Sequence, residues 1–363
     1  MVKPGEQNDL QACQMIILQV SALILGTALI GITLLSAVKT LVLPRSAPDK
    51  IFSGVFRGIR WFFDLLVSQS KDYTKRDRVM AYFAPVSLFM LLPVWMILLT
   101  LGFTAVFWVL DNVPVYQAFR ISTSSLLTLG YASRESLVST VLEFSAATFG
   151  LMLIALLIAY LPSMYNAFSR REAAVKLLEV RAGNPPSAEE MIARYHRIHG
   201  LEQLGEQWAT WELWFTELEE SHTSLSALVF FRSPQPGHSW VTTAITILDA
   251  AALTLAAIET PPDARAALCI RAGYLALRGI GESFRLPYPI DPHYPDDPIS
   301  VSWEEFNTAL DALERIGVPL KEDRQHAYQD FAGWRVNYDR LIPGLVELTM
   351  APSAPWTGER TYR

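Results

Sequence analysis

Three long runs of apolar residues dominate the first half of the chain. They cover residues 15–43, 79–110 and 137–161. A helix over the first run would be roughly 40 Å long, more than the ~30 Å hydrocarbon core of a bilayer. The pattern therefore predicts three transmembrane helices, with the third continuing as a cytoplasmic extension so that the whole helix covers residues 137–183. A cleaved signal peptide is the alternative for the first run, but that run is about twice the usual apolar length and lacks a basic start.

Residues 50–68 follow a helical period with one polar and one apolar face. The polar positions recur every three or four residues: Ser53, Arg57, Arg60, Asp64 and Ser68. The opposite face is aromatic and aliphatic, so the segment predicts an amphipathic helix that lies at the cytoplasmic membrane interface, with its arginines near anionic headgroups. The alternative is an ordinary helix packed on a cytoplasmic domain.

The segment between the second and third runs, residues 112–133, is predicted to fold as a short helix and a loop. Asn112 can cap the helix, and Pro114 suits its first turn because proline lacks only an amide that has no helical partner there. The helix is expected to end near Leu127 and to be followed by Thr128-Leu129-Gly130-Tyr131-Ala132. Such non-helical backbone at membrane depth is tolerated where it lines water or is buried in protein.

The Thr-Leu-Gly-Tyr sequence in this setting resembles the pore loop of the potassium-channel-like cation-channel superfamily, whose potassium-selective members carry Thr-Val-Gly-Tyr-Gly. The resemblance implies a small prokaryotic channel with a re-entrant pore helix and a filter. In such a filter the carbonyls of Thr128, Leu129, Gly130, Tyr131 and Ala132 replace the water around a permeant cation.

The chain departs from the family pattern at the outer end of this filter. Ala132 stands where the family has a second glycine, and Ser133 stands where aspartate is usual. If the second glycine position needs a positive φ, alanine costs roughly 1–2 kcal/mol there. Because Gly130-Tyr131 is kept, potassium is the preferred permeant ion, and the departures make a weakly selective pore for monovalent cations the alternative.

Three further residues, all in the predicted helix 137–183, are candidates for a role in the pore. Glu143 is a carboxylate inside a span, and its outer position predicts a hydrogen bond behind the filter rather than an ion ligand; the alternative is an interfacial residue that reaches water. Gly150 lies about where the inner helix of the family bends. Pro162 lies near the expected cytoplasmic mouth, where a gate could form. Simple packing and a helix end are the alternatives for these two residues.

The distribution of charge predicts the orientation. Residues 1–183 contain 16 Lys and Arg against 11 Asp and Glu, whereas residues 184–363 contain 14 against 25. The basic residues of the first half concentrate in the segment 44–78 and after the third run. By the positive-inside rule, the tail 1–14 and the pore loop face outside, and residues 184–363 are cytoplasmic. The expected location is the cell (inner) membrane, with several crossings.

Composition agrees with a membrane protein and excludes several other classes. The mean hydropathy is +0.23, and 51% of the residues are hydrophobic. The acidic second half lacks the basic patch that nucleic acid requires. Cys13 and Cys269 are expected to be free thiols on opposite sides of the membrane, and no set of His and Cys has metal spacing. We find no catalytic constellation and expect neither an enzyme nor a cofactor.

Residues 184–363 are predicted to form one all-α cytoplasmic domain after the break at Gly183-Asn184-Pro185-Pro186. The expected helices are 187–199, 201–231, 240–259, 262–284, 302–316, 320–338 and 339–349. The stretch 240–258 is apolar enough to be a fourth span, but Asp249 and its many threonines favour a buried soluble helix.

The chain is thus expected to be an all-α membrane protein. One pore loop cannot close a ring, so the channel hypothesis implies a homotetramer in the lipid bilayer. The helical domain would assemble or gate the pore, with an unknown cytoplasmic ligand or protein as a possible partner. A membrane-anchored interaction or signalling protein without conduction is the alternative.

Overall fold

The structure is a computed structural model. It describes residues 4–43, 49–68, 73–235, 237–261 and 263–356. Among these residues the regular elements are helices, accompanied by an isolated antiparallel bridge between Ile258 and Leu320. The all-helical prediction is therefore confirmed for the described part of the chain.

The chain divides into two compact units. We call them the N-terminal unit (residues 1–43, 48–61 and 86–163) and the C-terminal unit (residues 44–47, 62–85 and 164–363). Four helices of the described residues are long and apolar enough to cross a membrane. The protein thus has the helices of a multi-pass membrane protein.

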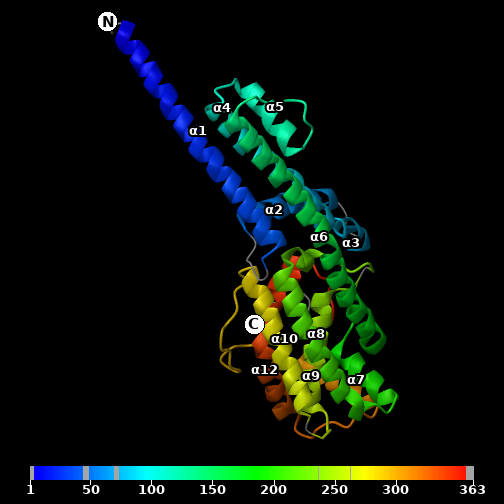
Figure 1. Ribbon diagram of the computed structural model, residues 1–363. Helices are drawn as coiled ribbons and strands as arrows, with labels where there is room; N and C mark the ends of the chain where they lie inside the picture. Colours follow the sequence, from blue (N-terminus) through cyan, green and yellow to red (C-terminus); the bar gives the residue numbers. More distant parts are fainter. Residues whose placement is uncertain (1–3, 44–48, 69–72, 236, 262, 357–363) are drawn as a thin grey trace. The chain divides into compact units, whose positions relative to one another are not determined.

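The helices of the first half are visible in Figure 1. They are α1 (Pro4–Leu41), α2 (Lys50–Val67), α3 (Tyr73–Met80), α4 (Phe83–Leu110), α5 (Val115–Leu126) and α6 (Leu137–Ala182). The predicted amphipathic helix corresponds to α2, and the predicted third helix with its extension corresponds to α6. Helix α1 begins at Pro4, so the expected tail 1–14 is helical over its described part.

The predicted second span, 79–110, lies within the apolar stretch Lys75–Leu110, which is long enough to cross a membrane. A turn divides this stretch near its start. Helix α3 ends at Met80, and α4 begins at Phe83 after a turn. Pro85 explains this start, because the first four amides of a helix have no intrahelical acceptor, and an amide that proline lacks is not missed there.

Helices α1 and α4 pack closely in the N-terminal unit. A Cβ added to Gly26 would lie 2.8 Å from the carbonyl oxygen of Gly102, so neither helix tolerates a larger residue at this crossing. Nearby, the indole Nε1 of Trp95 donates to the Ser36 hydroxyl at 3.1 Å. Small residues and side-chain hydrogen bonds are the usual means of holding membrane helices together.

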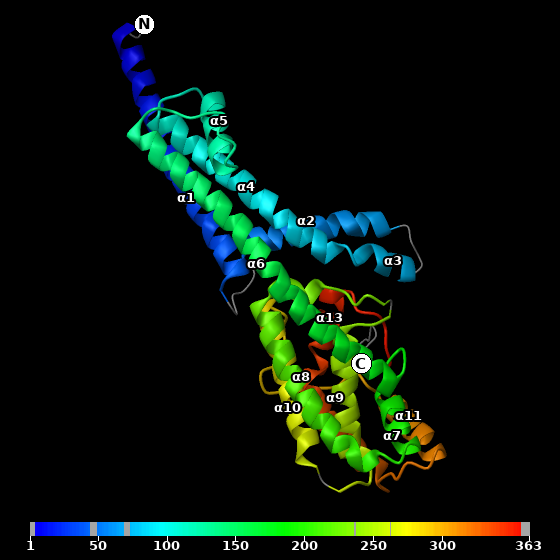
Figure 2. The ribbon, with the colours of Figure 1, turned by 45° about the vertical axis from the view of Figure 1, so that its right-hand side comes forward.

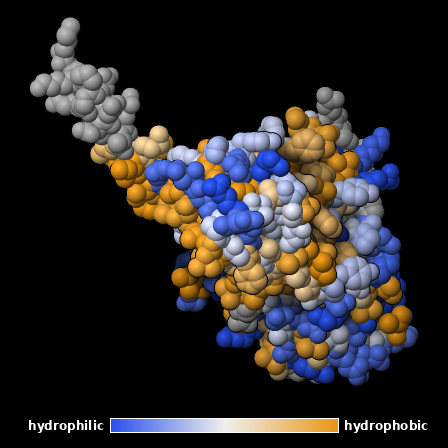
Figure 3. Space-filling view, turned by 45° about the horizontal axis from the view of Figure 1, so that its top comes forward, coloured by the Kyte–Doolittle hydropathy of each residue, from blue (hydrophilic) through white to orange (hydrophobic). Residues whose placement is uncertain are grey.

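Many apolar side chains of α1 between Cys13 and Leu41 are exposed. Figure 3 shows an apolar surface on the part of α1 next to the grey N-terminal residues, and Ile24 and Leu25 are 63% and 69% exposed. Water does not solvate such a continuous apolar surface favourably, but lipid does. The surface of α1 is therefore suited to a bilayer.

The C-terminal unit is a helical domain. It contains α3 and, after α6, the following elements: α7 (Ala188–Arg197), η1 (Leu201–Gln203), α8 (Leu204–Ser224), η2 (Ser226–Phe230), α9 (Trp240–Ala257), α10 (Ala264–Ser283), α11 (Trp303–Arg315), α12 (Arg324–Asp339) and α13 (Ile342–Thr349). Helices α8, α9 and α10 run side by side in both ribbon views (Figures 1 and 2). The predicted helix 201–231 is wrong, because α8 ends at Ser224 and a 3₁₀ helix follows.

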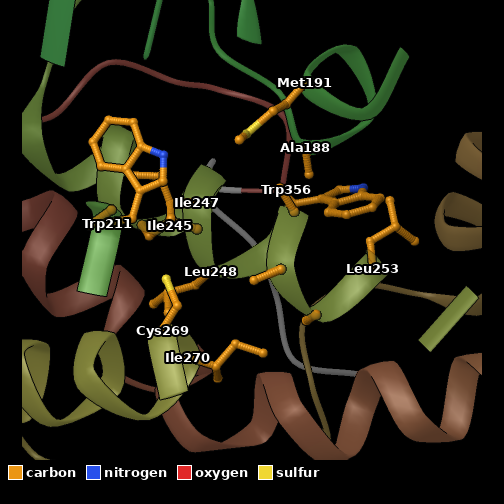
Figure 4. Packing of buried hydrophobic residues seen from close by; sticks show 14 of the residues in the cluster. Ala188, Met191, Trp211, Ile245, Ile247, Leu248, Leu253, Cys269, Ile270 and Trp356 are labelled. Atoms are coloured by element: carbon orange, nitrogen blue, oxygen red, sulfur yellow. The ribbon is translucent and has the colours of Figure 1, made fainter. Parts of the chain in front are cut away.

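Helix α9 is the centre of this unit. Its side chains are buried along nearly its whole length. Figure 4 shows Ile247 and Leu248 of α9 among Trp211 of α8 and Cys269 and Ile270 of α10. The structure therefore favours the expectation of a buried soluble helix over a membrane crossing for this stretch.

Candidate ion-conducting site

The cap of the short helix α5 lies two residues later than expected. Pro114 has non-helical backbone angles (φ −54°, ψ 144°) and is the residue before the helix. Asn112 adopts a left-handed backbone (φ 48°), which asparagine tolerates better than most residues. The prediction that Asn112 caps α5 is therefore wrong. A proline disfavours helical angles in the residue before it, so Val113 cannot readily join the helix.

The C-terminal end of α5 closes with a Schellman motif. The amide of Leu129 donates to the carbonyl oxygen of Ser124 at 2.7 Å, and the amide of Thr128 donates to that of Ser125 at 3.0 Å. This motif needs a left-handed residue after the helix, and Thr128 supplies it at φ 55°. A β-branched residue rarely adopts this conformation, so the first residue of the predicted filter is strained.

Gly130 is the second left-handed residue of the loop, with φ 69° and open space where a side chain would project. Residues 128–131 are exposed in the subunit, including half or more of the Leu129 and Tyr131 side chains. The backbone dihedral φ is positive at Thr128 and Gly130 but not at Leu129, so its sign alternates over these three residues. A backbone of alternating hand can turn successive carbonyl groups toward one side.

Hydrogen bonds and a cation–π contact connect the outer part of the loop to α5. The hydroxyl groups of Tyr131 and Thr123 lie 2.8 Å apart, and the Arg120 guanidinium lies 5.6 Å from the centre of the Tyr131 ring. The amide of Ala132 donates to the hydroxyl of Ser124 at 3.0 Å. Ala132 does not have a positive φ, so its backbone carries no cost of the kind expected if it replaced a left-handed glycine.

Helix α5 is itself held between α4 and α6. The hydroxyl of Ser122 donates to the carbonyl oxygen of Thr100 in α4 at 3.0 Å. On the other side, a Cβ added to Gly150 of α6 would lie 2.0 Å from the carbonyl oxygen of Leu126. The structure thus gives Gly150 a packing role, which is the alternative that the sequence left open, because a side chain there would displace the end of α5.

Glu143 contacts the residues that follow the loop. Its Oε1 accepts a hydrogen bond from the amide of Arg134 at 3.0 Å. A second contact joins the ends of the two flanking helices, because the Ser139 hydroxyl donates to Oδ1 of Asp111 at 2.5 Å. One carboxylate therefore bonds to the segment after the loop, and the other connects the two helices that flank it.

Pro162 lies inside α6, which continues to Ala182, so it does not end the helix. On the N-terminal side of Pro162, one face of α6 is apolar and is largely exposed in this chain. Its residues recur every three, four or seven positions: Leu137, Val141, Phe144, Leu151 and Ile158. A helix face with this spacing is suited to a neighbouring helix or to a pore.

The sequence identified the loop but missed the side chains that hold it. Ser122, Thr123 and Ser124 are three consecutive hydroxyl residues, and each reaches a different partner. A run of hydroxyl residues in the short helix between two apolar runs was the available signal, because hydroxyl groups that pack against apolar helices need hydrogen-bond partners.

Comparison with known proteins gives no relative: no family model, no curated protein and no solved structure matches this chain.

Proposed function

We propose that this protein is the subunit of a tetrameric cation channel. The observation that carries the proposal is the exposed loop 128–132, which follows the short helix α5 and is supported from α4, α5 and α6. A loop so firmly supported yet so exposed is suited to a site shared by symmetric copies. The helical C-terminal domain would assemble or gate the pore.

Backbone carbonyls are the proposed ligands, with potassium as the preferred ion. The end of α5 carries the partial negative charge of a helix C-terminus and would attract a cation toward the loop. The hydrogen bond from the Ala132 amide to the Ser124 hydroxyl favours a filter whose outer end differs from that of strict potassium channels. Conduction of monovalent cations with weak selectivity is therefore the second form of the proposal.

The orientation follows from loop charge, with the N-terminus and the loop outside and the C-terminal domain in the cytoplasm of a cell with an inner membrane. The exposed apolar residues of α2 are suited to the membrane interface. They are Trp61, Phe62, Leu65 and Leu66. This orientation would make residues 184–363 accessible to cytoplasmic partners.

Ion flux from liposomes loaded with potassium tests the proposal. The wild-type chain should release potassium, and Gly130→Asp should abolish release, because four added carboxylates would hold a cation too tightly for conduction. The control is Gly333→Asp, the same change at an exposed glycine of α12 with free space around it. Absence of flux in the wild type across pH, calcium and voltage would contradict the proposal.

Two further measurements separate the alternatives. Comparing potassium with sodium release distinguishes a potassium-preferring pore from a weakly selective one. The mass of the purified protein in detergent distinguishes a channel from a membrane-anchored interaction protein, because a monomer cannot form a ring of four loops.

A further inference from the structure

Residues 228–232 of the C-terminal unit lie where three separate parts of the chain meet. They comprise the last part of η2 and the two residues after it. Their partners come from α6, from the α3–α4 segment and from the end of α13, which are distant from one another in sequence. We call residues 228–232 the junction.

The first partner is Arg171, on the part of α6 that belongs to the C-terminal unit. Its side chain is 2% exposed. Its Nη1 donates to the carbonyl oxygen of Leu228 at 3.0 Å, and its Nη2 donates to that of Phe231 at 2.6 Å. Glu172 supplies the opposite charge at 2.7 Å. A buried guanidinium with this number of acceptors fixes the position of its helix, because losing them would leave a buried charge unsolvated.

The second partner is the segment that leads into α4. Arg232 of the junction donates from Nε to Oδ1 of Asp77 in α3 at 2.7 Å, and both side chains are 9% exposed. In addition, the Phe83 ring at the start of α4 lies edge-on to the Phe230 ring, 5.9 Å between centres. Phe230 in turn contacts Phe284 at 5.4 Å. The junction therefore holds this segment by charge and by aromatic packing.

The third partner is the end of α13. Arg232 donates to the carbonyl oxygens of Thr349 at 3.3 Å and of Met350 at 2.9 Å. Met350 is the left-handed residue that ends α13. Arg232 thus binds α3 and α13 with one side chain. A displacement of either helix would therefore change the hydrogen bonds that Arg232 makes with the other helix.

We propose that the junction is a coupling element, in which Arg171 and Arg232 are positioning residues that make the placement of α6 depend on the placement of α3. Helix α6 continues from this unit to the residues that support the proposed filter, and α4 continues from α3. A change in the helical domain at residues 228–232 would therefore act on both membrane segments together. The part of the proposal that concerns conduction rests on the proposed function; the mechanical coupling does not.

Hydrogen exchange of the full-length protein in lipid nanodiscs tests the coupling. Asp77→Ala removes a contact of α3, and we expect faster exchange both in α3 and, across the junction, in residues 164–175 of α6, by about five-fold or more as for an ordinary coupling between sites. The matched control is Asp311→Ala, which removes an exposed aspartate paired with Arg324 at 2.5 Å. It should leave both segments unchanged.

Two further variants protect the test against misfolding. Asp77→Asn keeps the shape and one acceptor and should give a smaller change in the same direction. Arg171→Lys keeps the charge but cannot reach Leu228, Phe231 and Glu172 together, and because coupling is reciprocal it should speed exchange in α3. Faster exchange confined to the mutated helix in both directions would overturn the proposal, as would an equal effect of Asp311→Ala.

Potassium release from liposomes is the second readout. Asp77→Ala should change the rate of release, measured against Gly130→Asp as zero. If exchange changes as expected while the wild type conducts no ions, the channel proposal fails and the coupling stands. If the wild type conducts and exchange changes only in the mutated helix, the coupling fails and the channel stands.

Discussion

Helices α1 and α9 are both apolar enough to cross a membrane, yet their surroundings differ completely. In the most apolar window of α1, 6% of the residues are buried, whereas 94% are buried in that of α9. Burial of apolar surface stabilises a helix in either environment, so hydropathy alone does not tell lipid from a protein core. The polar residues of a helix distinguish a protein core from lipid, and each polar residue of α9 needs a hydrogen-bonding partner inside the protein.

The partners of α9 include a charged and fully buried side chain. Asp249 accepts from Arg335 of α12 at 2.5 Å and from the hydroxyl of Tyr338 at 2.7 Å. In the N-terminal unit, α1 is instead joined to α4 through uncharged groups such as Ser36 and Trp95 and through glycines. The C-terminal unit can bury ions because its helices provide opposite charges, while lipid provides none.

Removing Arg335 should have the largest effect on stability. Its side chain is fully buried between Asp249 and Asp339. Arg335→Met would leave both carboxylates buried without a cation, which costs about 3–5 kcal/mol. The loss should appear as a lower urea midpoint, followed through the tryptophan fluorescence of the full-length protein.

The control for this change is Arg324→Met. Arg324 pairs with Asp311 and Glu314 at the surface of the same unit. An exposed pair contributes about 0–1 kcal/mol. Equal losses in the two variants would contradict the idea that buried ions distinguish the C-terminal unit.

Two glycines of α1 test the other half of the comparison. A Cβ added at Gly26 would lie within 3 Å of the carbonyl oxygen of Gly102 and of Cβ of Ala105. A Cβ added at Gly31 would meet no atom within 4 Å. Gly26→Ala should destabilise the unit by about 1–3 kcal/mol through overpacking. Gly31→Ala should stabilise it by up to about 1 kcal/mol, because alanine is the better helix former.

Thermal unfolding in detergent, followed by loss of helical signal, measures both glycine variants. Opposite signs for the two substitutions are the expected result. Destabilisation by both would show that α1 has a second tightly packed face, and the contrast between an open α1 and an enclosed α9 would then be wrong.

The sequence was informative wherever a local pattern determined the structure. The amphipathic period predicted α2 within a residue at each end, and the apolar run with its charged continuation predicted α6 over 137–183 against the observed Leu137–Ala182. The break before α4 had a signal in Pro85, because proline is accommodated best in the first turn of a helix. It was missed because the apolar pattern continues across the break.

Other features depend on contacts between distant residues. The end of α8 at Ser224 follows no strong breaking residue; the 3₁₀ turn after it turns the carbonyls of Leu228 and Phe231 toward Arg171. Two contacts near the loop likewise form only once the loop and its flanking helices have folded together. They are the hydrogen bond from the Ala132 amide to the Ser124 hydroxyl and the packing of Gly150 on Leu126. Local propensity contains no information on such pairs.

His222 provides the smallest and most specific test of how the C-terminal unit buries polar groups. Its ring is fully buried. Its Nδ1 must carry the proton, because it lies 2.9 Å from the carbonyl oxygen of Leu218, which can only accept. The unprotonated Nε2 then accepts from Nη1 of Arg171 at 3.3 Å. Burial, and secondly the Arg171 charge, hold the pKa of His222 well below its usual range.

The pH dependence follows from this depressed pKa. Between the folded pKa and about 6.5, the unfolded chain binds a proton that the folded chain does not, so stability rises with pH by up to about 1.4 kcal/mol per unit and is fully present above 6.5. Lowering the pH from 7 to 5 should therefore cost up to about 2 kcal/mol through this group. His222→Gln keeps an acceptor for Arg171 and should remove that part of the dependence. His326→Gln, at an exposed histidine of α12, should leave it unchanged. Urea midpoints at both pH values measure the difference, and identical pH profiles for the wild type and His222→Gln would show that the histidine does not stay neutral beside Arg171.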